Sequence, residues 1–379
     1  MSKGTVYPSE KRTFIDHETG VTVTQLTNHL CHSSHLYFTH WPYYDGLRKI
    51  LIHSDRGNVH NLFGLDPESG EIRQLTGFEP GDRGAGAFSA CVSRVRDVAY
   101  FWSGRTLKAL DLSSLEETAL WEAPGSDRLG QPNCNSNGEF VCFALSADLS
   151  DSLRMDLGRG YVGFDEYWEA HPRCRIFRVP VMGGEAELLW EEDNWIGHVN
   201  CSPTVPNILT FCHEGPWDKV DHRMWCLDAE SRKAWKVRPE PDRAVIGHEY
   251  WFEDGSRVAY HGAHRQGGRF LGHADWQSDD HAEYPISRGS MHFQSVDETL
   301  VVGDGGRDDP YIILWKWNGS GYDGALLCRH RGSFHTQRVH VHPTITPDKK
   351  AVIFTSDLGD YGNVYYVEIP EFESLPKVG

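Results

Sequence analysis

One short pattern of apolar residues occurs seven times along this chain, and it constrains the fold more than any other feature. Each copy is an apolar β-type run that ends in small or charged turn residues, and a partner β-type run follows it. The seven runs are 49–55, 98–104, 140–146, 208–214, 258–262, 300–304 and 351–357. A unit of roughly 40 to 50 residues with several strands is typical of a propeller blade. The sequence therefore predicts an all-β, seven-bladed β-propeller that fills residues 1–379 as a single domain.

The N-terminal segment predicts how the ring of blades closes. Residues 23–27 read Val-Thr-Gln-Leu-Thr and repeat the Ile-Arg-Gln-Leu-Thr of residues 72–76, yet no blade precedes them. We expect this strand to complete the last blade beside residues 364–368, because a closed ring leaves only short sheet edges. The alternative, an ordinary β-sandwich or two small β-domains, does not explain the even spacing of the runs.

Composition excludes several classes of partner. The formal net charge of −17 disfavours binding to nucleic acid, so an acidic ligand needs a local cluster to attract it. No run of about 18 apolar residues is present, so we expect no membrane span.

The nine cysteines are scattered without a C-x-x-C spacing, and residues 1–8 lack the apolar core of a secretory signal. We expect a cytoplasmic protein with reduced thiols, either a monomer or a homodimer.

Histidines precede the apolar runs in five of the seven units. If the apolar runs are second strands, the segments before them are first strands, which line the central channel of a propeller. A single strand histidine is more often structural, but the recurrence of one position predicts a cavity lined with imidazoles. The residues concerned are His35, His198, His248, His292, His340 and His342.

The sharpest local motif is Gln337-Arg-Val-His340-Val-His342-Pro343. In a strand, residues i and i+2 share a face, so His340 and His342 can chelate one metal while Gln337 reaches it from the preceding turn. His292, on the neighbouring blade, is a candidate fourth ligand. Imidazoles with an amide oxygen suit a borderline divalent ion, and open positions favour Mn²⁺ over structural Zn²⁺. Another divalent metal, or two solvated surface histidines, are the alternatives.

A second motif is the polar and aromatic segment 212–225, Cys-His-Glu-Gly-Pro-Trp-Asp-Lys-Val-Asp-His-Arg-Met-Trp. It is too long for a simple hairpin between strands of the fourth unit. Loops that hold charged and aromatic residues over a rigid scaffold often carry function. A purely structural corner is the alternative for part of this segment.

Together these motifs resemble oligogalacturonate lyases, which are seven-bladed propeller enzymes of pectin breakdown. The resemblance rests on residues 212–216 with 223–225, 248–251, 302–305, 337–343 and 354–357, and scattered matches cover nearly the whole chain. It implies metal-assisted β-elimination of short galacturonides to an unsaturated uronate, so the expected partner is a small acidic oligosaccharide. It also implies His248 as the catalytic base, Arg223 as an essential arginine, and His292, Gln337, His340 and His342 as ligands of Mn²⁺.

Substrate-binding residues are predicted on looser grounds. His35 and His198 belong to the same expected cavity. Arg56, in the turn 53–57, and Arg83, in Gly-Asp-Arg-Gly at 81–84, are candidate carboxylate binders on loops, with surface solvation as the alternative. The turn 53–57 departs from the family pattern, and the stretch between His292 and Gln337 is shortened.

Two other functions fit parts of the pattern. The first is a related lyase that acts on a different uronate disaccharide, with the metal and the base retained. The second is a noncatalytic, TolB-like propeller that binds a protein partner, which the Gln/His set and the lack of an export signal disfavour. A serine peptidase is excluded, because the chain has no G-x-S-x-G elbow.

Overall fold

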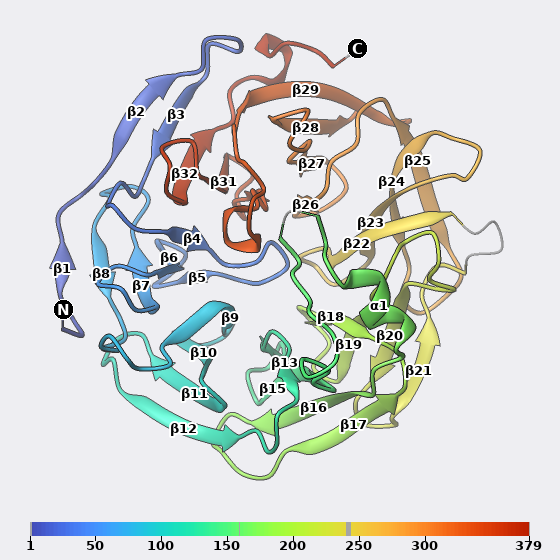
Figure 1. The fold of residues 1–379 in the computed structure, drawn as a ribbon. Helices are drawn as coiled ribbons and strands as arrows, with labels where there is room; N and C mark the ends of the chain where they lie inside the picture. Colours follow the sequence, from blue (N-terminus) through green and yellow to red (C-terminus); the bar gives the residue numbers. More distant parts are fainter. Residues whose placement is uncertain (1, 159, 240–243, 379) are drawn as a thin grey trace.

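The computed structural model describes residues 2–158, 160–239 and 244–378, and its strands form seven antiparallel sheets arranged as a ring (Figure 1). Each sheet is one blade, and the predicted apolar runs are the second strands of the blades. This result confirms the all-β, seven-bladed propeller. The second strands are β6 (Lys49–Ser54), β10 (Val98–Ser103), β15 (Phe140–Ser146), β19 (Ile208–His213), β23 (Val258–Ala263), β27 (Leu300–Gly303) and β31 (Ala351–Ser356).

The remaining strands complete the blades around these second strands. Blade one contains β4 (Ser33–His35), β5 (Tyr43–Tyr44), β7 (Asn61–Leu65) and β8 (Ile72–Gln74), and blade two contains β9 (Ala85–Val92), β11 (Thr106–Asp111) and β12 (Glu117–Glu122). Blade three contains β13 (Arg128–Leu129), β14 (Asn133–Cys134), β16 (Cys174–Pro180) and β17 (Glu187–Glu192), and blade four contains β18 (Ile196–Cys201), β20 (Met224–Asp228) and β21 (Lys233–Lys236). Blade five contains β22 (Val245–Trp251), β24 (Arg269–Ala274) and β25 (His281–Ile286), blade six contains β26 (Phe293–Ser295), β28 (Tyr311–Trp317) and β29 (Tyr322–Arg329), and blade seven contains β30 (Thr344–Ile345) and β32 (Asn363–Glu368).

N-terminal strands close the ring in the predicted way. Strand β3 (Thr22–Gln25) pairs with β32, with Thr24 opposite Tyr366, and β2 (Arg12–Ile15) extends the same sheet. The buried Thr27 hydroxyl donates to Asn363 Oδ1 at 3.0 Å. Strand β1 (Val6–Tyr7) pairs instead with β8 of blade one. Residues 6–25 therefore pair with both the first and the last blade of the ring.

Second strands are buried on both faces, which explains why they read as continuous apolar runs rather than as alternating ones. All six residues of β31 are buried. Neighbouring blades pack face to face, and the core between blades six and seven contains Val302, Leu314, Val352 and Phe354. Blades packed in this way hold the first strands, and the side chains that those strands carry, in fixed positions around the axis.

One long connection departs from the regular pattern. Residues 147–173 join β15 to β16 of blade three and contain the helix α1 (Phe164–Glu169), which begins after Gly163 at a φ of 75°. Figure 1 shows α1 lying over the inner part of the ring. Tyr167 is the buried residue of this helix, and its hydroxyl donates a hydrogen bond to the carbonyl of Ala147 at 2.9 Å. Short 3₁₀ turns occur at η1 (Gln337–Val339) and η2 (Phe372–Ser374).

All nine cysteines are buried and unpaired. Among the described residues, no helix is long and apolar enough to span a membrane.

Candidate active site

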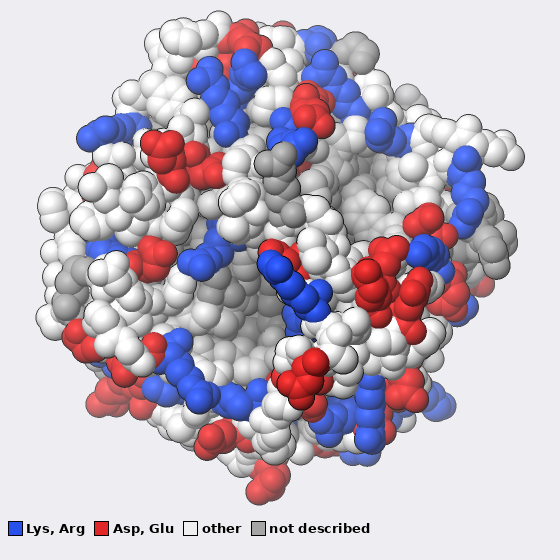
Figure 2. Space-filling view, in the orientation of Figure 1, with Lys and Arg blue, Asp and Glu red and all other residues white. Residues whose placement is uncertain are grey.

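A cavity of about 540 Å³ lies where the first strands of the blades converge. Figure 2 shows this face hollowed near its middle, with lysine and arginine side chains around the hollow. The lining comes from blades one to seven and from the 147–173 connection. It includes the predicted residues His198, His248, His292 and Gln337.

Three histidines form a cluster beside this cavity. His292, His340 and His342 are all buried, and one ring nitrogen from each lies within 4.8 Å of the others. Within the described chain, neither nitrogen of His342 nor Nδ1 of His340 has a hydrogen-bond partner. Burial, the largest cause, lowers the pKa of His340 to about 4 and that of His342 well below its usual value. Neutral, unpartnered imidazoles are suitable metal ligands, so the cluster fits a divalent ion.

The backbone of this segment differs from the prediction. Gln337 lies in η1, and residues 340–343 are outside any strand, so the expectation that His340 and His342 share a strand face is wrong. His342 instead has a φ of 44°, which lies in the left-handed region. The rings of the two histidines lie 5.6 Å apart in an irregular segment that includes this left-handed residue, so strand alternation does not bring them together.

His35 positions His342 and does not line the cavity. Its Nε2 lies 2.7 Å from the carbonyl of His342, and its Nδ1 lies 2.7 Å from the Thr355 hydroxyl. A carbonyl can only accept, so Nε2 carries the proton and Nδ1 accepts from Thr355. With both nitrogens used inside the protein, His35 has no ring nitrogen left for the predicted contact with substrate.

Asp304 orients His292. Its fully buried carboxylate lies 2.6 Å from Nδ1 of His292 and also accepts the backbone N–H of His292 at 2.9 Å. This contact places the proton on Nδ1 and leaves Nε2 as the ligand atom, the arrangement in which a carboxylate supports a metal-bound histidine.

Replacing Asp304 with asparagine should weaken Mn²⁺ binding by about 10- to 100-fold, the range observed when the partner of a ligating histidine is changed. Calorimetric titration with Mn²⁺ measures the effect, and the melting temperature checks the fold. Asp308→Asn is the matched control, because the Asp308 side chain is 95% exposed in the next turn. Equal affinity in the Asp304 variant and in the wild-type protein would show that Asp304 does not orient a ligand.

Gln337 contributes an amide to the same cavity. Its Nε2 donates to the carbonyl of Leu157, in the 147–173 connection, at 2.7 Å. With the nitrogen so engaged, the amide oxygen is the atom left for a metal ion. This contact also joins the 147–173 connection of blade three to the segment of blade seven that carries His340 and His342.

His248 lies beside the cluster, and its ring centre is 4.7 Å from that of His292. It lies on β22, where the pairing with β23 shifts between Gly247 and Glu249. A bulge of this kind re-aims a side chain. Nδ1 lies 2.8 Å from the carbonyl of Met291, so Nδ1 carries the proton and Nε2 keeps its lone pair. Burial first, and then the neighbouring His292, His198 and Arg223, hold the pKa of His248 well below its usual value.

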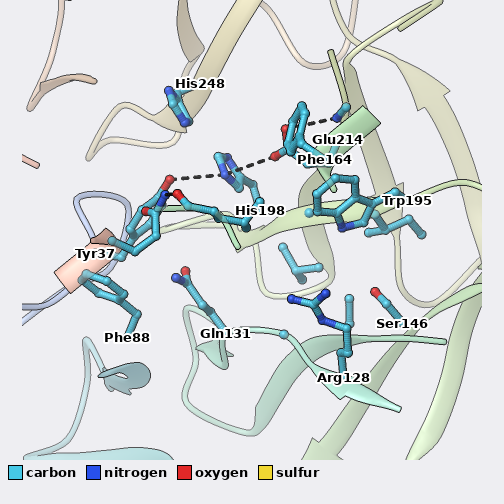
Figure 3. A pocket seen from close by; sticks show the side chains of 18 of the residues that line it. Tyr37, Phe88, Arg128, Gln131, Ser146, Phe164, Trp195, His198, Glu214 and His248 are labelled. Atoms are coloured by element: carbon cyan, nitrogen blue, oxygen red, sulfur yellow. Dashed lines mark hydrogen bonds and ion pairs between the residues drawn. The ribbon is translucent and has the colours of Figure 1, made fainter. Parts of the chain in front are cut away.

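His198 stacks on His248, with ring centres 5.2 Å apart and an interplanar angle of 9°. It also lies at a bulge, in β18, and has a φ of 48°. Its Nδ1 is 3.2 Å from Glu249 Oε1, and its Nε2 is 3.7 Å from Glu214 Oε2 and 3.3 Å from the Tyr37 hydroxyl. Figure 3 shows His198 between Tyr37 and Glu214 at the cavity wall.

Arg223 is placed differently from the expectation. Its side chain is 3% exposed and is absent from the cavity lining. Nε donates to Glu249 at 2.9 Å, and Nη1 donates to Glu214 at 3.2 Å. Burial alone would raise the pKa of Glu214, but Arg223 and His198 lower it. Arg223 therefore forms ion pairs with two buried carboxylates next to His198 and lies outside the cavity lining, and its role as an essential arginine stays a prediction.

The two loop arginines also lie elsewhere. Arg56 is buried, with Nη1 2.8 Å from Glu10 and its Cζ 4.6 Å from the ring centre of Tyr7, so it fastens the N-terminal segment. Arg83 is exposed, and its stem lies against Gly104 in the β10–β11 turn. Neither side chain lines the cavity, so the structure does not support the prediction that they bind substrate.

Sequence reasoning gave no role to several residues of the site. Asp304 directly follows β27, at the end where the segment before β26 carries His292, so strand register could have identified it. Glu214 and Glu249 belong to motifs noted in the sequence. Both pair with Arg223, and this shared contact depends on the packing of blade four against blade five. Tyr161 and Phe164 reach the cavity from the 147–173 connection, whose path no local pattern predicts.

Comparison with known proteins agrees with this geometry. A family model described as oligogalacturonate lyase matches residues 1–373. An oligogalacturonide lyase of Pectobacterium atrosepticum is 27% identical over 402 residues, which cover 98% of this chain and 99% of the relative. A solved oligogalacturonate lyase in complex with manganese has a TM-score of 0.88 at 27% identity, covering 98% of this chain and 99% of its own. The oligogalacturonate lyase of Vibrio parahaemolyticus has a TM-score of 0.86 at the same identity and coverage.

Proposed function

This chain belongs to the oligogalacturonate lyase family of polysaccharide lyases, and we propose that it cleaves short galacturonides by metal-assisted β-elimination, with His248 as the base. One observation carries this proposal. The neutral imidazole of His248, with its Nε2 lone pair free of the Met291 contact, lies at the cavity wall beside the buried three-histidine cluster. A base next to a metal-binding group is the arrangement that proton abstraction beside a carboxylate requires.

Removal of the C5 proton of a uronate is difficult while the neighbouring carboxylate carries its full charge. A divalent metal, with Mn²⁺ proposed here from the manganese-bound relative, would withdraw charge from that carboxylate when bound. His292, His340, His342 and the amide oxygen of Gln337 would hold it. Imidazole nitrogens together with an amide oxygen are donors that would suit a divalent ion such as Mn²⁺.

His248 accepts the C5 proton at Nε2. The C5–H electron pair then forms the C4=C5 double bond, and the C4–O4 bond breaks, so that the glycosidic oxygen leaves with the neighbouring sugar and takes a proton from water to become its hydroxyl. The low pKa of His248 keeps the imidazole unprotonated at neutral pH, and the Met291 carbonyl keeps the proton on Nδ1. The products are an unsaturated uronate, which rearranges to the 5-keto-4-deoxyuronate, and a shortened or monomeric uronate.

The decisive experiment supplies the Mn²⁺-loaded protein with 4-linked digalacturonate, trigalacturonate and a glucuronate-containing disaccharide. The ultraviolet absorbance of the conjugated C4=C5 bond measures turnover. Turnover of the galacturonides above that of the glucuronate compound supports the proposal. Turnover of the glucuronate compound alone would assign the site to the related uronate disaccharide lyase, and turnover of none of the three would overturn the lyase mechanism for this chain.

A further inference from the structure

We propose that Arg128 binds the second carboxylate of the substrate, so that the cavity selects uronides with two neighbouring acidic sugars. This inference rests on the proposed function and specifies its substrate class. The metal-binding cluster and His248 act on the carboxylate and the C5 proton of one sugar. A disaccharide of galacturonate brings a second carboxylate into the cavity, and burying an unpaired charge is costly.

Arg128 is the one lysine or arginine among the described residues that line the cavity, and Glu214 is the one acidic residue. Glu214 pairs with Arg223 at 3.2 Å and not with Arg128. The Arg128 side chain is exposed to solvent at the cavity wall, and no carboxylate of the lining pairs with it. An anionic ligand that enters the cavity meets the positive charge of Arg128 at the wall away from His248.

The neighbourhood of Arg128 contains no carboxylate within ion-pair distance in the described part of the chain. Arginines nearby on the same blade behave differently: Arg173 pairs with Glu191 at 2.7 Å, and Arg175 pairs with Asp127. The contacts of the Arg128 guanidinium are apolar or weakly polar instead. Nη1 lies 3.5 Å from the sulfur of Met155, and Cζ lies 5.3 Å from the ring centre of Tyr167.

These contacts hold the side chain without neutralising it. The backbone of Arg128 pairs with that of Ser146 in the short β13–β15 ladder, and Tyr167 is itself fixed by its hydrogen bond to Ala147. A guanidinium held from one side by sulfur and an aromatic face keeps its other N–H donors for a ligand. Two parallel donors match a carboxylate, which explains the choice of arginine over lysine at such a position.

The position of Arg128 fits the second sugar of a disaccharide. Figure 3 shows Arg128 with Gln131 and Ser146 across the cavity from His248, and shows Trp195 and Phe164 along the adjoining wall. The rings of Trp195 and Phe164 lie 5.2 Å apart and form an apolar surface beside the guanidinium. Apolar walls with a few placed polar groups are typical of sites that bind ligands of this size.

The test compares Arg128→Gln with the wild-type protein and with Arg173→Gln, a control that removes the same charge from an exposed position of blade three. Each Mn²⁺-loaded protein is assayed for kcat and KM on digalacturonate, and on digalacturonate methyl-esterified at the sugar that does not lose its C5 proton. We expect Arg128→Gln to raise KM for the free acid by about 10- to 100-fold with kcat nearly unchanged, because a remote contact contributes to binding alike in the ground and transition states. It should also remove the wild-type preference for the free acid over the ester.

Three results would overturn the inference: an unchanged KM in Arg128→Gln, an equal effect of Arg173→Gln, or a wild-type protein that does not distinguish acid from ester. Calorimetric binding of digalacturonate to His248→Ala, with and without Arg128→Gln, measures the same contact without turnover. If the wild-type protein cleaves digalacturonate and the affinity is independent of Arg128, only this inference fails. If the wild-type protein neither binds nor cleaves it, this inference and the proposed function both fail.

Discussion

His248→Ala should lower kcat on digalacturonate by about 10²- to 10⁴-fold, the contribution that a positioned general base makes to proton transfer. The substitution removes Nε2, the atom that accepts the C5 proton, and it leaves the His292, His340 and His342 cluster intact. Initial rates of C4=C5 formation measure the effect. Titration with Mn²⁺ should give an affinity close to that of the wild-type protein.

His281→Ala is the matched control for this variant. His281 belongs to the same blade, but it is exposed on the outer strand β25, so its loss should leave kcat unchanged. A His248→Ala protein within tenfold of the wild-type rate would contradict the assignment of the base. A large loss of rate together with a loss of Mn²⁺ would show instead that His248 supports the metal-binding cluster.

His342→Ala should lower kcat/KM by about 10²- to 10³-fold, because a catalytic metal supplies several kcal/mol of transition-state stabilisation. Its two unpartnered ring nitrogens make His342 the member of the cluster with the clearest capacity for a ligand bond. Treatment of the wild-type protein with a chelator should produce a similar loss. Added Mn²⁺ should restore the wild-type activity and leave the variant inactive.

Thermal unfolding gives a readout that is independent of activity. Binding of an ion to the folded state alone raises the melting temperature, so Mn²⁺ should stabilise the wild-type protein and not His342→Ala. His335→Ala is the control, because His335 is exposed in the same segment. If Mn²⁺ stabilises both variants equally, the cluster does not bind the metal and the ligand assignment is wrong.

Much of the fold followed from local patterns. A strand that is buried on both faces must be apolar throughout, so the seven second strands could be read directly from their composition. The repeated Gln-Leu-Thr sequence at 25–27 and 74–76 then predicted that an N-terminal strand joins the last blade, and β3 pairs with β32 there. The gathering of His198, His248 and His292 also followed, because the segment before each second strand occupies the same place in its blade.

The orientation of individual side chains could not be read in this way. Bulges at Gly197 and Gly247 and the left-handed backbone of His342 decide which atoms face the cavity, and strand alternation predicts none of these features. The same limit applied to Arg223. Its position in a sequence motif did not predict its ion pairs with Glu214 and Glu249, which form only when blades four and five pack together.

The sequence alone thus determined the number of blades, the closure of the ring and the set of histidines near its axis, because each depends on contacts that repeat within one blade. The tertiary structure alone decided that His35 supports His342, that Asp304 orients His292 and that Arg128 faces the cavity without a carboxylate partner. His35 and His342 are 307 residues apart in the chain and meet only when the first and last blades close the ring. Interactions between blades depend on the assembled geometry, and no local pattern of residue types records them.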